Sequence, residues 1–355
     1  MSTTTTNVSA RVESLDYLRG IMAVCVLLYH FTVWTIGHQD VDTFLGKIGI
    51  YGVSIFYILS GLTLYLVYQK SLVFSWEHLN SFAIKRVFRI FPLLWLSILL
   101  SLLLKFIQHK PFPTHWSLWL NFTGLYGFIS PGTYISTGAW SIGNELVFYA
   151  LFPFILWMLH KSSNLFYSFW GLTCVIAGVI GFYFLDADTL LSKQWEVYIN
   201  PFNQLFFFVG GIAIGTLDQA SLDVFRYQSG RRLFFIVILT FILYPVEGNQ
   251  IRIVSGWERI IFSALSFSIC TSFYATRGKY IITPMKSILS FLGETSYSIY
   301  LLHPLVFLGL RELDVKMVSQ TEHFILSLVL TLCMSYLSYE LVEKPFVRLG
   351  KRLLS

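Results

Sequence analysis

The stretch SLDYLRGIMAVCVLLYHFTVW, residues 14–34, decides the fold class of this chain. Its apolar residues extend over about the 20 positions that a helix needs to cross a bilayer. Within that run lie Arg19, near one end, and His30, well inside. Placing ionisable side chains in hydrocarbon is costly, and proteins that do so generally use them. The segment therefore predicts a membrane-spanning helix that also carries functional residues.

The composition extends this interpretation to the whole chain. Of the 355 residues, 55% are hydrophobic and only 12% are charged, and the mean hydropathy is +0.65. A soluble domain of this length could not cover its surface with so few polar groups. The fold class predicted is therefore all-α: a polytopic bundle of membrane helices.

Apolar windows of spanning length predict about ten transmembrane helices, at 15–37, 48–69, 90–107, 140–160, 164–184, 201–217, 233–246, 257–276, 287–308 and 324–342. We expect a disordered cytoplasmic leader over 1–14, a transmembrane domain over 15–343 and a basic cytoplasmic tail over 344–355. The stretch 108–139 is rich in aromatic residues but broken by Pro and Gly, which predicts an interfacial or re-entrant segment on the outer face.

Charge patterning gives an orientation. Most of the 25 Lys and Arg residues fall in alternate connections on one side of the predicted spans. By the positive-inside rule, this distribution places both termini in the cytoplasm. It also accounts for the net charge of +6 and the pI near 9.0 without nucleic acid as a partner. The four cysteines lie in different apolar segments without ligand spacing, so we expect neither disulfides nor a bound metal.

Arg19 and His30 share one face of the first helix. They are eleven residues apart, and eleven steps of about 100° come within some 20° of three whole turns. At about 1.5 Å per residue they are separated by roughly 16 Å along the axis. This polar track suits a substrate path from the cytoplasm into the membrane. The alternative is that Arg19 only sets topology and that His30 is a hydrogen-bonded core residue.

A buried carboxylate is the second candidate feature. In GAWSIGNELVFYALFPF, residues 138–154, Glu145 lies about a turn and a half from the outer end of the predicted span. A carboxylate at that depth needs a partner. It could orient an imidazole and stabilise its cationic form. The alternative is an interfacial Glu145 that reaches water, beside Trp140 as an ordinary aromatic-belt residue.

Two further segments carry candidates with strong structural alternatives. In SFAIKRVFRIFPLLWL, residues 81–96, Arg86 and Arg89 share a helix face and could clamp phosphate oxygens, although a basic cluster beside a span is more often a topology signal. In FLGETSYSIYLLHPLVF, residues 291–307, His303 is predicted near the outer end of its helix, where an interfacial role is the alternative.

Taken in order, these segments resemble the acyltransferase 3 family of integral membrane acyltransferases. The resemblance rests on LDYLRGIMAVCVLLYH, GVSIFYILSG, KRVFRIFPLLWL, WSIGNELVFYALFPF, LGETSYSIYLLHPL and YELVEKPF, which together cover most of the chain. One departure is Ser54, which stands where many relatives have an acidic residue. The sequence has no appended hydrolase-like domain, so we expect the stand-alone type.

The resemblance implies an O-acetyltransferase. Such an enzyme moves an acetyl group from cytoplasmic acetyl-CoA to a hydroxyl of a cell-surface polysaccharide or lipid-linked glycan, such as O-antigen, capsule or exopolysaccharide. It implies His30 as general base or transient acyl carrier and Glu145 as the group that orients or charge-stabilises it. The donor-binding residues implied are Arg19, Arg86 and Arg89, and those of the acceptor site are Trp140, Ser141 and His303.

The resemblance also bears on location and partners. It implies a multi-pass protein of the bacterial inner membrane, with acetyl-CoA, the outer glycan and the lipid bilayer as partners, polysaccharide assembly proteins as further ones, and no permanently bound cofactor. Three alternatives remain: a transporter or flippase of a small solute or glycan precursor, a transferase of succinyl or another acyl group, and a structural subunit of a polysaccharide assembly complex.

Overall fold

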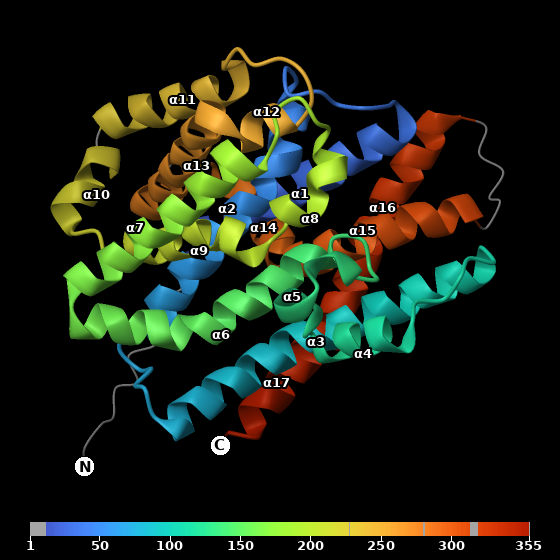
Figure 1. Cartoon of the computed structure of the whole chain (residues 1–355), viewed down its shortest axis with the longest axis horizontal. Coiled ribbons are helices and arrows are strands. Elements are labelled where there is room, and N and C mark those ends of the chain that lie inside the picture. Colours follow the sequence, from blue (N-terminus) through green and yellow to red (C-terminus); the bar gives the residue numbers. More distant parts are fainter. Residues whose placement is uncertain (1–11, 227, 280, 313–318, 355) are drawn as a thin grey trace.

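The computed structural model describes residues 12–226, 228–279, 281–312 and 319–354, and this part of the chain is helical without a strand (Figure 1). The first half comprises α1 (Glu13–Thr35), α2 (Phe44–Tyr68), α3 (Trp76–Ile107), α4 (His115–Thr123), α5 (Tyr126–Ile129), η1 (Pro131–Thr133), α6 (Ala139–Lys161), α7 (Ser163–Val179) and η2 (Ile180–Phe184). The second half comprises η3 (Leu191–Gln194), α8 (Trp195–Tyr198), α9 (Pro201–Gly215), α10 (Gln219–Arg226), α11 (Gln228–Leu243), α12 (Ile251–Val254), α13 (Gly256–Thr276), α14 (Thr283–Glu294), α15 (Ser296–Glu312), α16 (Gln320–Ser338), η4 (Tyr339–Glu343) and α17 (Lys344–Arg352).

Six of the described helices are long and apolar enough to cross a membrane: Glu13–Thr35, Phe44–Tyr68, Trp76–Ile107, Ala139–Lys161, Ser163–Phe184 and Gln320–Arg352. A seventh candidate is the pair Leu191–Tyr198 and Pro201–Gly215, bent by 62°. These helices confirm a helical membrane bundle. The count of ten spans and the cytoplasmic termini stay predictions.

Two predicted windows differ from the structure for local reasons. Window 287–308 is divided at Thr295, where α14 ends and α15 begins. In window 233–246 the helix ends at Leu243, so its apolar part is shorter than a span. Neither window therefore contains one helix of spanning length.

The predicted ends of the chain are partly helical. Residues 1–11 of the expected leader lie outside the described residues, and α1 already begins at Glu13. The expected basic tail forms α17, which packs along α3, with Gly350 against Phe88 (Figure 1). We call the end of the bundle where α17 meets α3 the α17 end.

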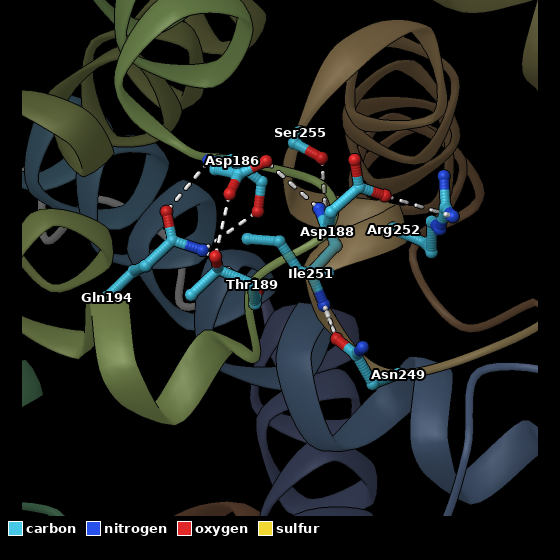
Figure 2. Close-up of polar contacts among 8 residues, drawn as sticks. All are labelled: Asp186, Asp188, Thr189, Gln194, Asn249, Ile251, Arg252 and Ser255. Atoms are coloured by element: carbon cyan, nitrogen blue, oxygen red, sulfur yellow. Dashed lines mark hydrogen bonds and ion pairs between the residues drawn. The ribbon is translucent and has the colours of Figure 1, made fainter.

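An ordered loop follows η2 at the opposite end of the bundle (Figure 2). The Gln194 side chain accepts from the backbone N–H of Asp186 at 2.7 Å and donates to its carbonyl at 2.8 Å. The Thr189 hydroxyl donates to Asp186 Oδ2 at 2.6 Å, and this bond holds the pKa of Asp186 below its usual value. Asp188 lies 3.9 Å from Arg252, at α12. The loop thereby fixes the chain immediately before Trp195.

The centre of the bundle is α2, the most buried of the candidate spans. It packs closely on α9 because glycines meet backbone at the contact. A Cβ at Gly61 of α2 would lie 2.0 Å from the Phe208 carbonyl oxygen, and one at Gly211 of α9 would lie 2.0 Å from the Ile58 carbonyl oxygen. Small residues allow membrane helices to approach in this way.

Replacing Gly211 by Ala is expected to destabilise the bundle by roughly 1–3 kcal/mol, because the new methyl group meets backbone that cannot move aside. Gly178→Ala is the matched control, since its Cβ would have nothing within 4 Å. Thermal unfolding of the two purified variants in detergent measures the difference. A Gly211→Ala protein as stable as the Gly178→Ala protein would contradict this account of the α2–α9 contact.

Candidate active site

A cavity of about 410 Å³ lies between α1, α2, α3, α6, α14, α15 and η4. This volume is within the range of small-molecule sites, roughly 300–1,000 Å³. Along α2 its lining extends from Thr63 to Val53, which lie ten residues apart and are separated by about 15 Å along the helix. Thr63 marks its α17 end, and Val53, Phe56 and Tyr300 mark its inner end.

Arg19 lines the cavity near the start of α1 and is held by three hydrogen bonds. Its Nη1 contacts Asp16 Oδ1 at 3.0 Å, and its Nη2 donates to Thr63 Oγ1 at 2.7 Å and to the Leu59 carbonyl at 3.2 Å. The contacts with Thr63 and Leu59 join α1 to α2. The guanidinium is therefore fixed in position at the cavity wall.

Arg86 also lines the cavity but keeps hydrogen-bonding capacity. Its Nη2 donates to Tyr68 Oη at 3.3 Å, and its Nε is buried without a partner among the described residues. The guanidinium lies 5.7–5.8 Å from the ring centroids of Tyr68, Phe82 and Tyr149, within the range of cation–π contacts. Aromatic faces thus hold Arg86, whose guanidinium makes a single hydrogen bond among the described residues.

Arg89 is fixed by a carboxylate from the far end of the chain. Its Nη1 lies 2.7 Å from Glu343 Oε2, and Ser298 donates to Glu343 Oε1 at 2.5 Å. Glu343 is 1% exposed and belongs to η4, a π-helical turn between α16 and α17. Such insertions often occur at functional sites. Glu343 is therefore a buried partner of Arg89 at the cavity.

Glu145 lines the same cavity. Its Oε1 accepts from Ser60 Oγ at 3.0 Å and, through a short bond, from Tyr149 Oη. The sequence prediction made Glu145 the partner that orients His30. The structure instead gives Glu145 hydroxyl partners from α2 and α6 and gives His30 a different partner, and the two residues are not hydrogen-bonded to each other.

His30 pairs with His303. Its Nδ1 lies 2.9 Å from His303 Nε2, and His303 Nδ1 lies 2.9 Å from the Ile299 carbonyl oxygen. Trp34 stacks on the His30 ring, with centroids 5.1 Å apart and planes 12° apart. His303 is only 1% exposed, so it is a core residue of α15, and the alternative of an interfacial residue does not hold.

The histidine pair lies beyond the inner end of the cavity, and neither ring lines it. On α15, His303 comes one helical turn after Tyr300, and their ring centroids are 6.2 Å apart. Phe56 packs edge-on against Tyr300, with centroids 6.0 Å apart. These two aromatic rings thus separate the cavity from the histidines.

Ser141 and Trp140, the two remaining candidates, lie in different surroundings. Ser141 lines the cavity, and its Oγ lies 2.9 Å from Tyr300 Oη. Trp140 packs instead against Trp195 and Tyr198, with centroids 5.4 and 6.0 Å apart. Trp140 is 8% exposed, so the structure makes it a packing residue at the opposite end of the bundle.

The cavity also contains three hydroxyl groups that were not predicted from the sequence, those of Ser60, Thr63 and Tyr149. Ser60 and Thr63 contact Glu145 and Arg19, and Tyr149 contacts Glu145. The spacing of Glu145 and Tyr149, four residues apart on one helix, could have indicated the last of these. The contacts of Ser60 and Thr63 join different helices and had no signal in the sequence.

A sequence model described as an acyltransferase domain matches residues 12–340. The chain belongs to the acyltransferase 3 family. Proteins of Staphylococcus aureus strains COL and MSSA476, both named "Putative O-acetyltransferase", are each 25% identical over 97% of this chain. A "Putative acetyltransferase" of Acidianus two-tailed virus is 23% identical over 81% of both chains. This chain covers only 58% of the length of the two staphylococcal proteins, and no solved structure matches it.

Replacing Glu343 by Gln is expected to destabilise this protein because Arg89 loses its carboxylate partner. Breaking a fully buried pair costs about 3–5 kcal/mol. Because the Arg89 side chain is 37% exposed, we expect about 1–3 kcal/mol here.

Glu340→Gln is the matched control, since it removes the surface partner of Lys344 from the same helical turn and should cost less than about 1 kcal/mol. Thermal unfolding of the two purified variants compares the losses. Equal midpoints of thermal unfolding for the two variants would mean that the burial of Glu343 does not determine how much its ion pair with Arg89 stabilises the protein.

Proposed function

We propose that this protein transfers an acetyl group from cytoplasmic acetyl-CoA to a hydroxyl of a cell-surface polysaccharide or lipid-linked glycan. The observation that carries the proposal is one cavity that gathers Arg19, Arg86 and Arg89 and ends one helical turn from the His30–His303 pair. Membership of the acyltransferase family and the names of the relatives support the same reaction class.

The arginines suit the anionic part of the donor. Coenzyme A carries phosphates, and guanidinium groups bind phosphate oxygens through charge-assisted hydrogen bonds. Arg86 is the strongest candidate because its Nε is buried without a partner among the described residues. Arg19 and Arg89, already paired with Asp16 and Glu343, supply fixed positive charge at the wall.

The rest of the cavity suits the arm of the donor. From the arginines, the lining leads past Glu145 and Tyr149 to Phe56 and Tyr300. A thioester brought to this inner end is one helical turn from His303. Movement of the Phe56 and Tyr300 rings would join the cavity to the histidines. The aromatic side chains at this end suit an uncharged acyl group such as acetyl better than the anionic succinyl group.

The chemistry then requires a base. The acceptor hydroxyl gives its proton to His30 while its oxygen bonds to the acyl carbon of the thioester. The carbon–sulfur bond breaks, and the coenzyme A thiolate leaves and takes the proton from His30. The products are an O-acetyl ester and free coenzyme A.

The location of the acceptor follows from the same proposal. The α17 end, with its basic helix, faces the cytoplasm of a bacterial inner membrane, and the glycan approaches His30 from the other end. Ser141 lies at the inner end of the donor cavity, and Trp140 supports the outer surface. Polysaccharide assembly proteins are expected to deliver the glycan.

Inverted membrane vesicles from the producing cell test the proposal. Labelled acetyl-CoA is added, and both free thiol and label in the glycan fraction are measured. We expect both with the wild-type protein and loss of both, by about 100-fold or more, in His30→Ala, because general base catalysis contributes about 10²–10⁴-fold.

His38→Ala is the matched control, since this histidine lies just after α1 and is exposed. It should keep wild-type rates. Solute flux with intact thioester would favour the transporter alternative, and full activity of folded His30→Ala would overturn the assignment of His30.

Replacing Arg86 and Arg89 by Gln is expected to weaken binding of coenzyme A to the purified protein, most strongly at low ionic strength, because salt screens charge attraction. Lys85→Gln is the control: this residue belongs to the same basic cluster but does not line the cavity. Calorimetric titration at two salt concentrations measures the effect. Equal binding by the arginine and lysine variants would return the cluster to a topological role.

A further inference from the structure

We infer that His303 is a positioning residue that holds His30 in the Nδ1-protonated tautomer, so that His30 Nε2 is the nitrogen that reacts. The inference rests on the proposed function and adds a role for a second histidine, which the sequence analysis had placed at the acceptor site. It follows from the direction of two consecutive hydrogen bonds: His303 Nδ1–H donates to the Ile299 carbonyl, and His30 Nδ1–H donates to His303 Nε2.

The direction is set at the Ile299 carbonyl oxygen. A carbonyl only accepts, so the nitrogen 2.9 Å from it, Nδ1 of His303, must carry the proton. A neutral imidazole has one N–H, which leaves His303 Nε2 as an acceptor. The nitrogen 2.9 Å from that acceptor, Nδ1 of His30, must therefore be the donor.

These hydrogen-bond directions require that His303 is neutral, and its surroundings favour this state. Its side chain is 1% exposed, and neither histidine is hydrogen-bonded to a carboxylate among the described residues. A buried cation without a counter-charge is strongly disfavoured. Reversal of the two bonds would need a doubly protonated His303 or an unpaired carbonyl at Ile299.

Because the single N–H of neutral His30 is on Nδ1, its Nε2 keeps a lone pair. No described residue is hydrogen-bonded to this nitrogen, and it is not among the buried polar atoms without a partner. His30 is half-buried, so Nε2 can meet a substrate. The rings of Trp34 and His303 lie nearly parallel to the His30 ring, with interplanar angles of 12° and 18°, and limit its rotation.

This arrangement has a chemical consequence. When His30 takes a proton at Nε2, its Nδ1–H already points at an acceptor, so the imidazolium keeps its hydrogen bond as it forms. The backbone carbonyl and His303 thus do for His30 what a buried carboxylate does for the histidine of hydrolytic triads: they fix the tautomer and the ring orientation.

Three variants of the full-length protein in detergent or nanodiscs test the inference. His303→Leu removes the acceptor, whereas His303→Gln keeps a side-chain oxygen that can accept from His30. Phe307→Leu is the packing control, since this ring lies one turn further along α15 beside Phe31 and Trp34.

We expect His303→Leu to lower kcat by about 100-fold or more while KM for acetyl-CoA changes little, because His303 does not line the donor cavity. His303→Gln should recover part of the loss, and Phe307→Leu should stay near wild-type kcat. A His303→Leu protein with wild-type kcat would overturn the inference even if the proposed reaction is correct.

Nitrogen-15 NMR of labelled histidines gives a readout that does not depend on turnover. The His30 signals, assigned by comparison with His30→Ala, should report Nδ1–H in the wild-type protein and change to Nε2–H in His303→Leu. An Nε2–H tautomer of His30 in the wild-type protein would overturn the inference. An Nδ1–H tautomer in a protein without transferase activity would uphold the positioning and refute the proposed function alone.

Discussion

The cost of placing polar and charged groups inside an apolar bundle governs how this protein is built. An unpaired charge in such an interior is strongly unfavourable, so each one that is retained needs a partner in the fold. Arg89 has Glu343, Arg19 has Asp16 and Thr63, and Glu145 has two hydroxyls. Because most of these contacts join different helices, they fix the relative positions of the helices as well as the charges.

The same constraint divides the site into two environments. Near the α17 end, arginines and carboxylates surround a cavity where a charged ligand can replace water. Beyond Phe56 and Tyr300, the two histidines are hydrogen-bonded to each other and, through His303, to a backbone carbonyl. The Trp34 ring stacks on His30, and neither histidine is hydrogen-bonded to a charged group among the described residues. A donor with a charged head and a small reactive end matches this gradient from charged to neutral surroundings.

Much of this could be predicted from the sequence, because the signals are local. Hydropathy predicted a helical membrane protein, the segment 14–34 forms α1, and ordered motifs indicated the family that the comparison confirms. The spacing of Arg86 and Arg89 placed both on one helix face, and both line the cavity. The number of spans was harder to predict, because hydropathy alone does not indicate that a helix breaks at Thr295 or ends at Leu243.

From the sequence alone, Arg19, His30 and Glu145 can be placed within membrane helices. How these residues pair depends on the tertiary fold. Glu145 and His303 were both available to His30, and the packing of α15 against α1 brings His303 within 2.9 Å of it, while Glu145 turns to Ser60 and Tyr149. The physical reason is that a hydrogen bond between helices depends on their crossing and rotation, which arise from the packing of many apolar side chains and glycines and have no signature at any single position.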